Sequence, residues 1–206
     1  MAQKSTSAER IVSRETDEKL LLLERLVQKW NPIINLVSKE SLKTIRSRHI
    51  DDSMQIFRLA HFRGGVWCDL GSGGGFPGLV VAIMMAEEGV GGRVVLVEAD
   101  QRKSAFLREA ARQLEVTVEV FTERIERVPP LGAAVLSARA LAGLPRLCEF
   151  ANLHMATNGV ALFPKGVRYQ DEITQAKAAW VFDLTVHQSV TERASAVLEI
   201  RNIRHV

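Results

Sequence analysis

The sequence predicts an α/β fold in which a parallel sheet carries helices on both faces and is preceded by a helical extension. Two observations carry this prediction. From residue 65 onward, short apolar stretches alternate with amphipathic ones, which is typical of strands joined by helices. Before residue 61, apolar residues recur at helical spacing instead. We therefore expect a helical extension over residues 1–60, packed on the core, and a Rossmann-like domain over residues 61–206.

The expected elements follow the apolar pattern along the chain. Spacings of three and four predict a first helix from Glu18 to Ile34, interrupted near Asn31-Pro32, and a second helix over residues 38–60. We expect strands at 65–69, 93–98, 117–121, 133–138 and 159–164, with helices near 77–87, 102–114 and 144–155. Residues 169–180 predict a last helix, and residues 182–189 and 196–204 predict a terminal hairpin.

The composition excludes several classes of protein. The chain of 206 residues suits one domain with a short extension, and its net charge of +3 permits an anionic partner without requiring one. Cys68 and Cys148 lie in apolar segments, so we expect buried free thiols, no disulfide framework and no metal site. The sequence begins without an apolar leader, and its longest apolar run, residues 79–86, is too short to span a membrane. We expect a cytoplasmic enzyme.

The most informative segment is a glycine-rich turn at residues 69–78, Asp-Leu-Gly-Ser-Gly-Gly-Gly-Phe-Pro-Gly. It follows an apolar strand and opens an apolar helix, which is the arrangement of a nucleotide-type cofactor site. Gly73, Gly75 and Gly78 match the dinucleotide pattern G-x-G-x-x-G. Asp69, however, stands at the strand tip, where a carboxylate would repel a pyrophosphate. A carboxylate there suits a cationic ligand, such as the amino group and sulfonium of S-adenosylmethionine.

Three side chains near this turn are candidates for holding the cofactor. Glu98 ends the second apolar strand, where its two oxygens can accept hydrogen bonds from both hydroxyls of a ribose. Asp69 has two roles that can coexist, contact with the methionine part of the cofactor and capping of the glycine turn. Phe76 either packs against the cofactor or fills the core beneath the turn. We expect the site at the carboxyl ends of the strands.

Further short motifs occur along nearly the whole chain. They are Phe76-Pro77-Gly78 after the glycines, Asn35-Leu36, His49 with Asp52-Ser53, Lys103 with Phe106-Leu107, Arg124-Ile125-Glu126, Arg139-Ala140-Leu141 and Lys165-Gly166. In this order and spacing they resemble the glucose-inhibited division protein B family, the 16S (small-subunit) ribosomal RNA 7-methylguanosine methyltransferases. Two positions depart from the family pattern. Ala138 stands between Ser137 and Arg139, and Gly74 stands where alanine or proline is more usual.

The resemblance implies a Rossmann-like class I S-adenosylmethionine-dependent methyltransferase acting on N7 of one guanine in 16S ribosomal RNA. The resemblance implies cofactor contacts at Gly71, Phe76, Ile125, Glu126 and Arg139. The chemistry of the glycine turn and of the strand ends separately indicates Asp69, Gly73 and Glu98. Guanine N7 has a free lone pair and needs no base, so positioning and electrostatics supply most of the acceleration. We therefore assign no catalytic residue.

Several charged residues are candidates for substrate contact. Arg139 and Lys165 end two predicted strands, and each either contacts RNA and orients the guanine or is a surface charge. Six further cations lie in predicted helical segments: Arg46, Arg48, Arg102, Lys103, Arg108 and Arg112. They either form a basic face that binds RNA phosphates or are charges on solvated helix faces. His49 and Asp52 lie on the second predicted helix, where an ion pair within the helix or a cap explains them as well as function does.

Three other functions stay open on the sequence alone. They are a methyltransferase for a small molecule or a protein, a nucleotide-binding module without catalysis and, more distantly, a dehydrogenase. RNA dependence and a salt-sensitive affinity would separate the first of these from an RNA methyltransferase. The expected partner is 16S ribosomal RNA or the small ribosomal subunit, with no membrane, and the expected state is a monomer.

Overall fold

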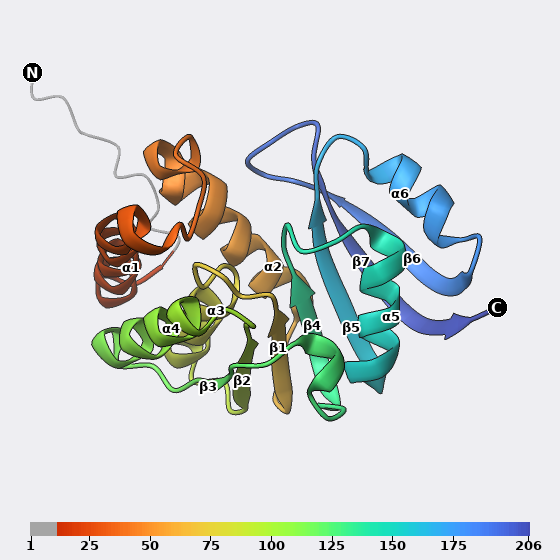
Figure 1. The fold of residues 1–206 in the computed structure, drawn as a ribbon, viewed down its shortest axis with the longest axis horizontal. Coiled ribbons are helices and arrows are strands. Elements are labelled where there is room, and N and C mark those ends of the chain that lie inside the picture. Colours follow the sequence, from red (N-terminus) through yellow and green to blue (C-terminus); the bar gives the residue numbers. More distant parts are fainter. Residues whose placement is uncertain (1–11) are drawn as a thin grey trace, which may run out of the picture.

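The computed structural model describes residues 12–206. Its strands form one seven-stranded sheet in the order β3-β2-β1-β4-β5-β7-β6 (Figure 1). The strands are β1 (Val66–Leu70), β2 (Arg93–Val97), β3 (Glu119–Phe121), β4 (Ala133–Ala138), β5 (Met155–Lys165), β6 (Trp180–Gln188) and β7 (Ala196–His205). The first five are parallel, and β7 runs antiparallel to both β5 and β6. The strand order reverses at β1, which lies between β2 and β4. The crevice beside this reversal, at the carboxyl ends of β1 and β4, is where such sheets bind ligands.

Helices cover both faces of the sheet, as the alternation of strands and helices predicted. One face packs against α2 (Asp52–Ala60), α3 (Gly78–Glu88) and α4 (Gln101–Leu114). Outside these helices, α1 (Arg14–Ile34) packs on α3 and α4. The other face of the sheet packs against α5 (Leu144–His154) and α6 (Tyr169–Ala176). Neighbouring residues of β1 divide between the two cores, with Trp67 in the first and Cys68 in the second. Both Cys68 and Cys148 are buried free thiols, as expected.

The first predicted helix is confirmed as α1, but it begins at Arg14 rather than Glu18 and runs through Pro32 without the predicted interruption. Its ends have identifiable causes. Ser13 caps its start by accepting a hydrogen bond from the Thr16 backbone N–H at 3.1 Å. The helix contains Pro32 in its last turn and ends at Ile34, where Asn35 adopts a left-handed conformation. Asn31 fixes the exit, because its side-chain oxygen accepts from the Val37 backbone N–H at 2.8 Å. The polar residues 1–11 lie outside the described part of the chain.

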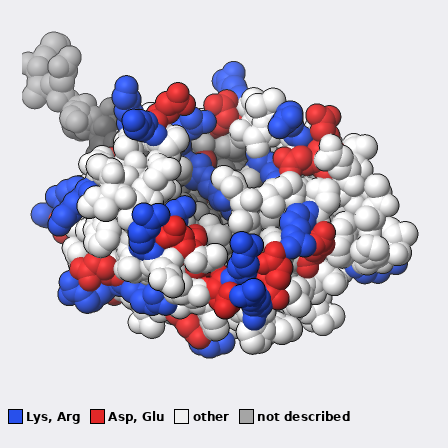
Figure 2. Space-filling view, viewed as in Figure 1, with Lys and Arg blue, Asp and Glu red and all other residues white. Residues whose placement is uncertain are grey.

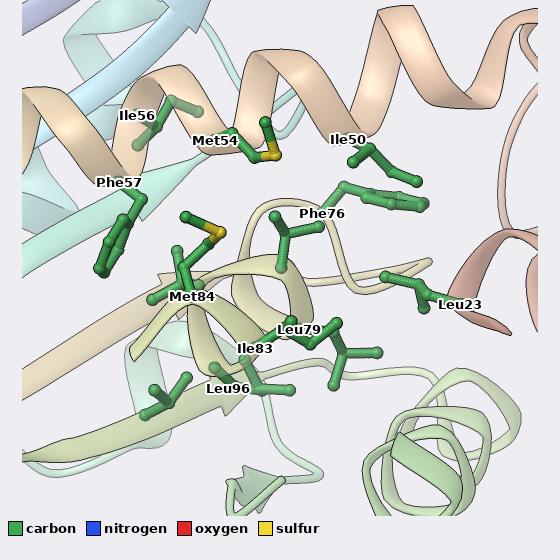
Figure 3. Packing of buried hydrophobic residues seen from close by; sticks show 14 of the residues in the cluster. Leu23, Ile50, Met54, Ile56, Phe57, Phe76, Leu79, Ile83, Met84 and Leu96 are labelled. Atoms are coloured by element: carbon green, nitrogen blue, oxygen red, sulfur yellow. The ribbon is translucent and has the colours of Figure 1, made fainter. Parts of the chain in front are cut away.

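The second predicted helix, over residues 38–60, is wrong as a single α-helix. The segment consists of a 3₁₀ turn (Ser41–Thr44), a π-helical stretch (Arg46–Asp51) and then α2. The wider π winding lets Ile45 and Ile50, five residues apart, both be buried. Figure 3 shows Ile50 and Met54 pointing toward Phe76 and Met84, so this segment packs directly on the glycine turn and α3. Apolar spacing predicted burial here but not the change of winding.

The last helix also differs from its prediction, because α6 ends at Ala176 rather than at residue 180. Trp180 begins β6, in which buried or half-buried residues alternate with exposed ones as far as Thr185. The predicted terminal hairpin is confirmed as β6 and β7, which pair antiparallel. No helix within residues 12–206 is long and apolar enough to cross a membrane.

The apolar core runs without a break from α1 and α2 into α3 and α4. Residues 14–60 are therefore packed on the core of the domain rather than tethered to it. The division of the chain after residue 60 stays a prediction.

Candidate functional site

The glycine turn joins β1 to α3 at the edge of the sheet where the strand order reverses. Gly71 and Gly73 have φ angles of +67° and +52°, which glycine adopts without the cost that other residues bear. Gly78 opens α3 against the sheet, and a Cβ there would lie 2.3 Å from Leu96 Cδ2. A Cβ on Gly71 would lie 2.6 Å from Leu141 Cδ1, so the loop after β4 covers the turn. Sequence reasoning missed Leu141, although its motif includes it.

Asp69 serves as the cap of the turn. Its carboxylate is 1% exposed and accepts hydrogen bonds from the Gly78 N–H at 3.2 Å and from Ser137 Oγ at 2.8 Å. Ser137 accepts in turn from Trp67 Nε1 at 3.0 Å. Burial raises the pKa of Asp69 to about 7, despite hydrogen bonds from Ser137, Ser72 and Gly78 that favour its charged form. The carboxylate thus fixes the turn from inside; its direct contact with the cofactor stays a prediction.

Glu98 lies over the same turn from the end of β2. Its Oε2 accepts from the Gly73 N–H at 2.9 Å, and its Oε1 accepts from the Asp100 N–H at 2.8 Å. Asp100 caps α4 by accepting from the Arg102 and Lys103 backbone N–H groups. A carboxylate oxygen has two lone pairs, so each oxygen of Glu98 can still accept from a hydroxyl. The position predicted for a ribose therefore carries a half-buried pair of acceptor oxygens, and the ribose contact itself stays a prediction.

Ile125 and Glu126 follow β3, in a short 3₁₀ turn (Ile125–Arg127). Ile125 is buried against α5, and its carbonyl accepts from His154 Nε2 at 3.1 Å. The Glu126 side chain is exposed and forms an ion pair with Arg146 of α5. Both residues stand beside the carboxyl end of β3, the edge of the sheet that also holds Glu98.

Arg139 follows β4 and reaches across to the segment before α2. Its Nη1 lies 2.7 Å from His49 Nδ1, its Nη2 lies 3.3 Å from Asp52 Oδ2, and Nη2 also donates to the Arg48 carbonyl. Burial raises the pKa of Asp52, while a hydrogen bond from Thr191 and the charge of Arg139 oppose the rise. The two motif residues His49 and Asp52, left without a role by the sequence, therefore meet Arg139 in space.

Phe76 closes this arrangement from the glycine turn. It is 7% exposed and belongs to the core of α1–α4, which is the filling role considered for it. Its ring stacks on His49, with centroids 4.9 Å apart and an interplanar angle of 27°. The turn and the helical extension are thus in direct contact at the site.

Lys165 is not a surface charge. Its side chain is 8% exposed and donates to Glu172 Oε2 at 2.6 Å and to the Ala142 carbonyl at 2.8 Å. The same Glu172 oxygen accepts from the Leu144 N–H at 2.8 Å, at the start of α5. Lys165 therefore fixes the loop between β4 and α5, and an RNA contact would have to replace bonds that it already makes.

The six arginines and lysines proposed as a basic face do not form one cluster. Arg46 and Arg48 belong to the π-helical stretch, whereas the other four lie on α4. Arg46, Arg102 and Arg112 each pair with a carboxylate. This arrangement favours the interpretation as solvated helix faces, with the exception of Arg48, which lines a cleft.

A cleft of about 1030 Å³ opens beside Arg139. Figure 2, viewed from the same side as Figure 1, shows a hollow near the middle of the molecule with basic side chains in its walls. The walls come from the segment before α2, the loop after β4, the end of β5, α6 and the turn between β6 and β7. The charged side chains that line it include Arg48, Asp52, Arg139, Lys165, Arg168 and Glu172. The volume is sufficient for a nucleotide, and both cations predicted to meet the substrate face it.

The strand order, the glycine turn and the acidic residue after β2 define a class I S-adenosylmethionine-dependent methyltransferase fold. A solved methyltransferase from Geobacter sulfurreducens has the same fold, with a TM-score of 0.60 at 14% sequence identity, over 93% of this chain and 91% of that one.

The sequence comparisons are more specific than the fold. The profile of the GidB family, described as rRNA small subunit methyltransferase G, matches residues 16–203. A relative named Ribosomal RNA small subunit methyltransferase G from Cereibacter sphaeroides is 46% identical over the whole of both chains. Another of the same name from Ruegeria pomeroyi is 50% identical over 95% of each chain. The chain belongs to the GidB family of rRNA small subunit methyltransferases.

Proposed function

We propose that this protein transfers the methyl group of S-adenosylmethionine to N7 of a guanine in 16S ribosomal RNA. The observation that carries this proposal is the family match along residues 16–203. The cleft beside Arg139 supports it, because it opens at the carboxyl ends of β4 and β5, the edge of the sheet where such folds bind ligands. No residue of the glycine turn lines this cleft.

The residues of the turn fit S-adenosylmethionine. Gly71 and Gly73 carry no Cβ, so a ligand can approach the turn closely where Leu141 does not cover it, and Glu98 holds unused lone pairs beside Gly73. We assign Gly71, Gly73 and Glu98 to direct cofactor contact. Ile125 and Glu126 border the same place at the end of β3, and Asp69 and Phe76 support the turn from beneath.

Positioning accounts for the chemistry. S-adenosylmethionine supplies a methyl group on a positively charged sulfur. Guanine N7 attacks with its own lone pair, so the protein has no proton to remove. Guanine O6 lies beside N7 on the same edge of the base, and an arginine can donate to it. We assign this donation to Arg139, which faces the cleft. The Lys165–Glu172 pair acts indirectly, by fixing the loop that bears Ala142 and ends at Leu144.

The proposal extends to the state in which the protein works. We infer a monomer in the cytoplasm that meets its RNA as part of the small ribosomal subunit. Residues 1–60 would serve as an extension that completes the substrate cleft, since Arg48 and Asp52 line it. Sedimentation of the purified protein, alone and with subunits, tests the oligomeric state and the association.

The test is methyl transfer from labelled S-adenosylmethionine to three substrates in parallel. These are small ribosomal subunits that lack the modification, naked 16S ribosomal RNA and bulk protein. We expect label in RNA only, and more of it in the small ribosomal subunits than in naked 16S ribosomal RNA. Label in protein would contradict the proposal. So would the absence of label from all three substrates when the protein still binds S-adenosylmethionine.

A matched pair of variants controls the assay. Gly73→Val places a branched side chain at a φ of +52° beside Glu98 and should abolish cofactor binding and transfer together. Gly91→Val lies where a Cβ meets nothing within 4 Å and should leave both unchanged. If Gly73→Val lost cofactor binding but still transferred methyl groups, the glycine turn would not be the cofactor site of a methyltransferase.

A further inference from the structure

His49 and Asp52 form a motif that the proposed chemistry does not use. Both contact Arg139, which lies 90 residues away from His49 in the sequence. With the Arg48 carbonyl, they surround the guanidinium with three acceptors from one stretch of the helical extension. The extension thus determines where this cation points.

The bond between His49 and Arg139 has only one chemical form. A guanidinium has no acceptor, so Arg139 Nη1 must donate and His49 Nδ1 must accept. The imidazole is therefore neutral, with its proton on Nε2. Burial lowers the pKa of His49 to about 3, and the charges of Arg139 and Arg48 add to the effect. The ring stays in this form throughout the physiological pH range.

The ring has no other polar bond within the described residues. His49 Nε2 is buried and finds no partner there. The imidazole ring also stacks on the Phe76 ring, with 4.9 Å between the two centroids. The orientation of the ring thus depends on Phe76 on one side and on Arg139 on the other.

We propose that His49 is a positioning residue that holds the guanidinium of Arg139 at the substrate cleft through its Nδ1 lone pair, with Asp52 as second anchor. The inference rests on the proposed function. The Nε–H and one Nη1–H of Arg139 make no bond among residues 12–206 and stay available for the O6 of the guanine. Placement of this kind matters because small displacements at a reacting group lower the rate strongly.

Two substitutions of His49 separate the lone pair from the ring. His49→Asn keeps an acceptor oxygen near the place of Nδ1 and removes the ring. His49→Phe keeps a ring that can stack on Phe76 and removes the acceptor. Asp51→Asn is the control, because Asp51 pairs with Arg46 at 3.6 Å and not with Arg139.

We expect activity to follow the acceptor. His49→Phe should lower kcat/KM for RNA about ten- to hundredfold, the range for a lost hydrogen bond to a charged group. His49→Asn should retain most of the activity, and Asp51→Asn all of it. The dissociation constant of S-adenosylmethionine should stay unchanged in all three. In an Arg139→Lys background, His49→Phe should cost little more, because its effect passes through the arginine.

Two results would overturn the proposal. One is the reverse order, an active His49→Phe with an inactive His49→Asn, which would assign His49 to packing alone. The other is an undiminished loss from His49→Phe in the Arg139→Lys background.

Nitrogen-15 NMR of the imidazole gives a readout that needs no RNA. We expect the Nε2–H tautomer at neutral pH, and an Nδ1–H tautomer would refute the proposal. A wild-type protein that methylates no RNA would instead overturn the proposed function, while the tautomer would still test the pairing.

Discussion

Asp69 should make stability depend on pH near neutrality. Burial raises its pKa from 3.8 to about 7 in the folded protein, with Glu98 adding a smaller repulsion. Between these two values the folded state holds a proton that the unfolded state has lost, so stability falls as pH rises and levels off above pH 7. From pH 5 to pH 8 this covers about two units at about 1.4 kcal/mol each, or about 3 kcal/mol.

Asp69→Asn isolates this effect. The amide oxygen can accept from the Gly78 N–H, and the amide nitrogen can donate to Ser137 Oγ. The Ser137 proton then turns toward the Cys68 carbonyl, which lies 3.5 Å away. The variant keeps the bonds of the turn and has no charge at any pH, so it should fold.

Urea unfolding of both proteins at pH 5 and pH 8 measures the difference directly. Groups that titrate elsewhere cancel when the wild-type free energy of unfolding is subtracted from that of the variant. This difference should move by about 3 kcal/mol in favour of Asp69→Asn between the two pH values. A difference that does not change with pH would refute the account of Asp69 as a buried cap.

Two further substitutions test how the site is held. Gly78→Ala should destabilise the protein by about 1–3 kcal/mol, because its Cβ would lie 2.3 Å from Leu96 Cδ2; an unchanged melting temperature would contradict this packing. Lys165→Met should cost about 2–4 kcal/mol, since it leaves the half-buried Glu172 without its cation. Denaturant unfolding checks it, and a Lys165→Met protein of full stability but lost RNA affinity would show that Lys165 meets RNA instead.

The sequence predicted what depends on local patterns. The strand, glycine turn and apolar helix around residues 69–78 were placed correctly, because glycine spacing and apolar runs are local signals. The terminal hairpin was placed for the same reason. The cofactor and the family followed from the turn and from the order of the motifs, and the family match confirms both.

Features that depend on distant partners were not predictable. Nothing near Lys165 indicated that Glu172 and the Ala142 carbonyl would bury its charge. The π winding before α2 accompanies the packing of this segment on the glycine turn, and helical spacing in the sequence reports neither.

Ser137 could have been found from the sequence, because a lone hydroxyl in the apolar stretch 133–138 needs a buried partner. Its partner, Asp69, lies 68 residues away. The contact of Arg139 with His49 could not have been predicted from the sequence. Each residue belongs to a separate motif, and each motif has an explanation that does not involve the other.

Nucleoside analysis of the methylated RNA tests the central claim most directly. Small ribosomal subunits that lack the modification would be incubated with the protein and S-adenosylmethionine, and their 16S ribosomal RNA digested and separated by mass spectrometry. The account predicts new 7-methylguanosine, at one site, that is absent with Gly73→Val. A methyl group on another atom or base, or an unmethylated RNA beside a protein that binds the cofactor, would contradict it.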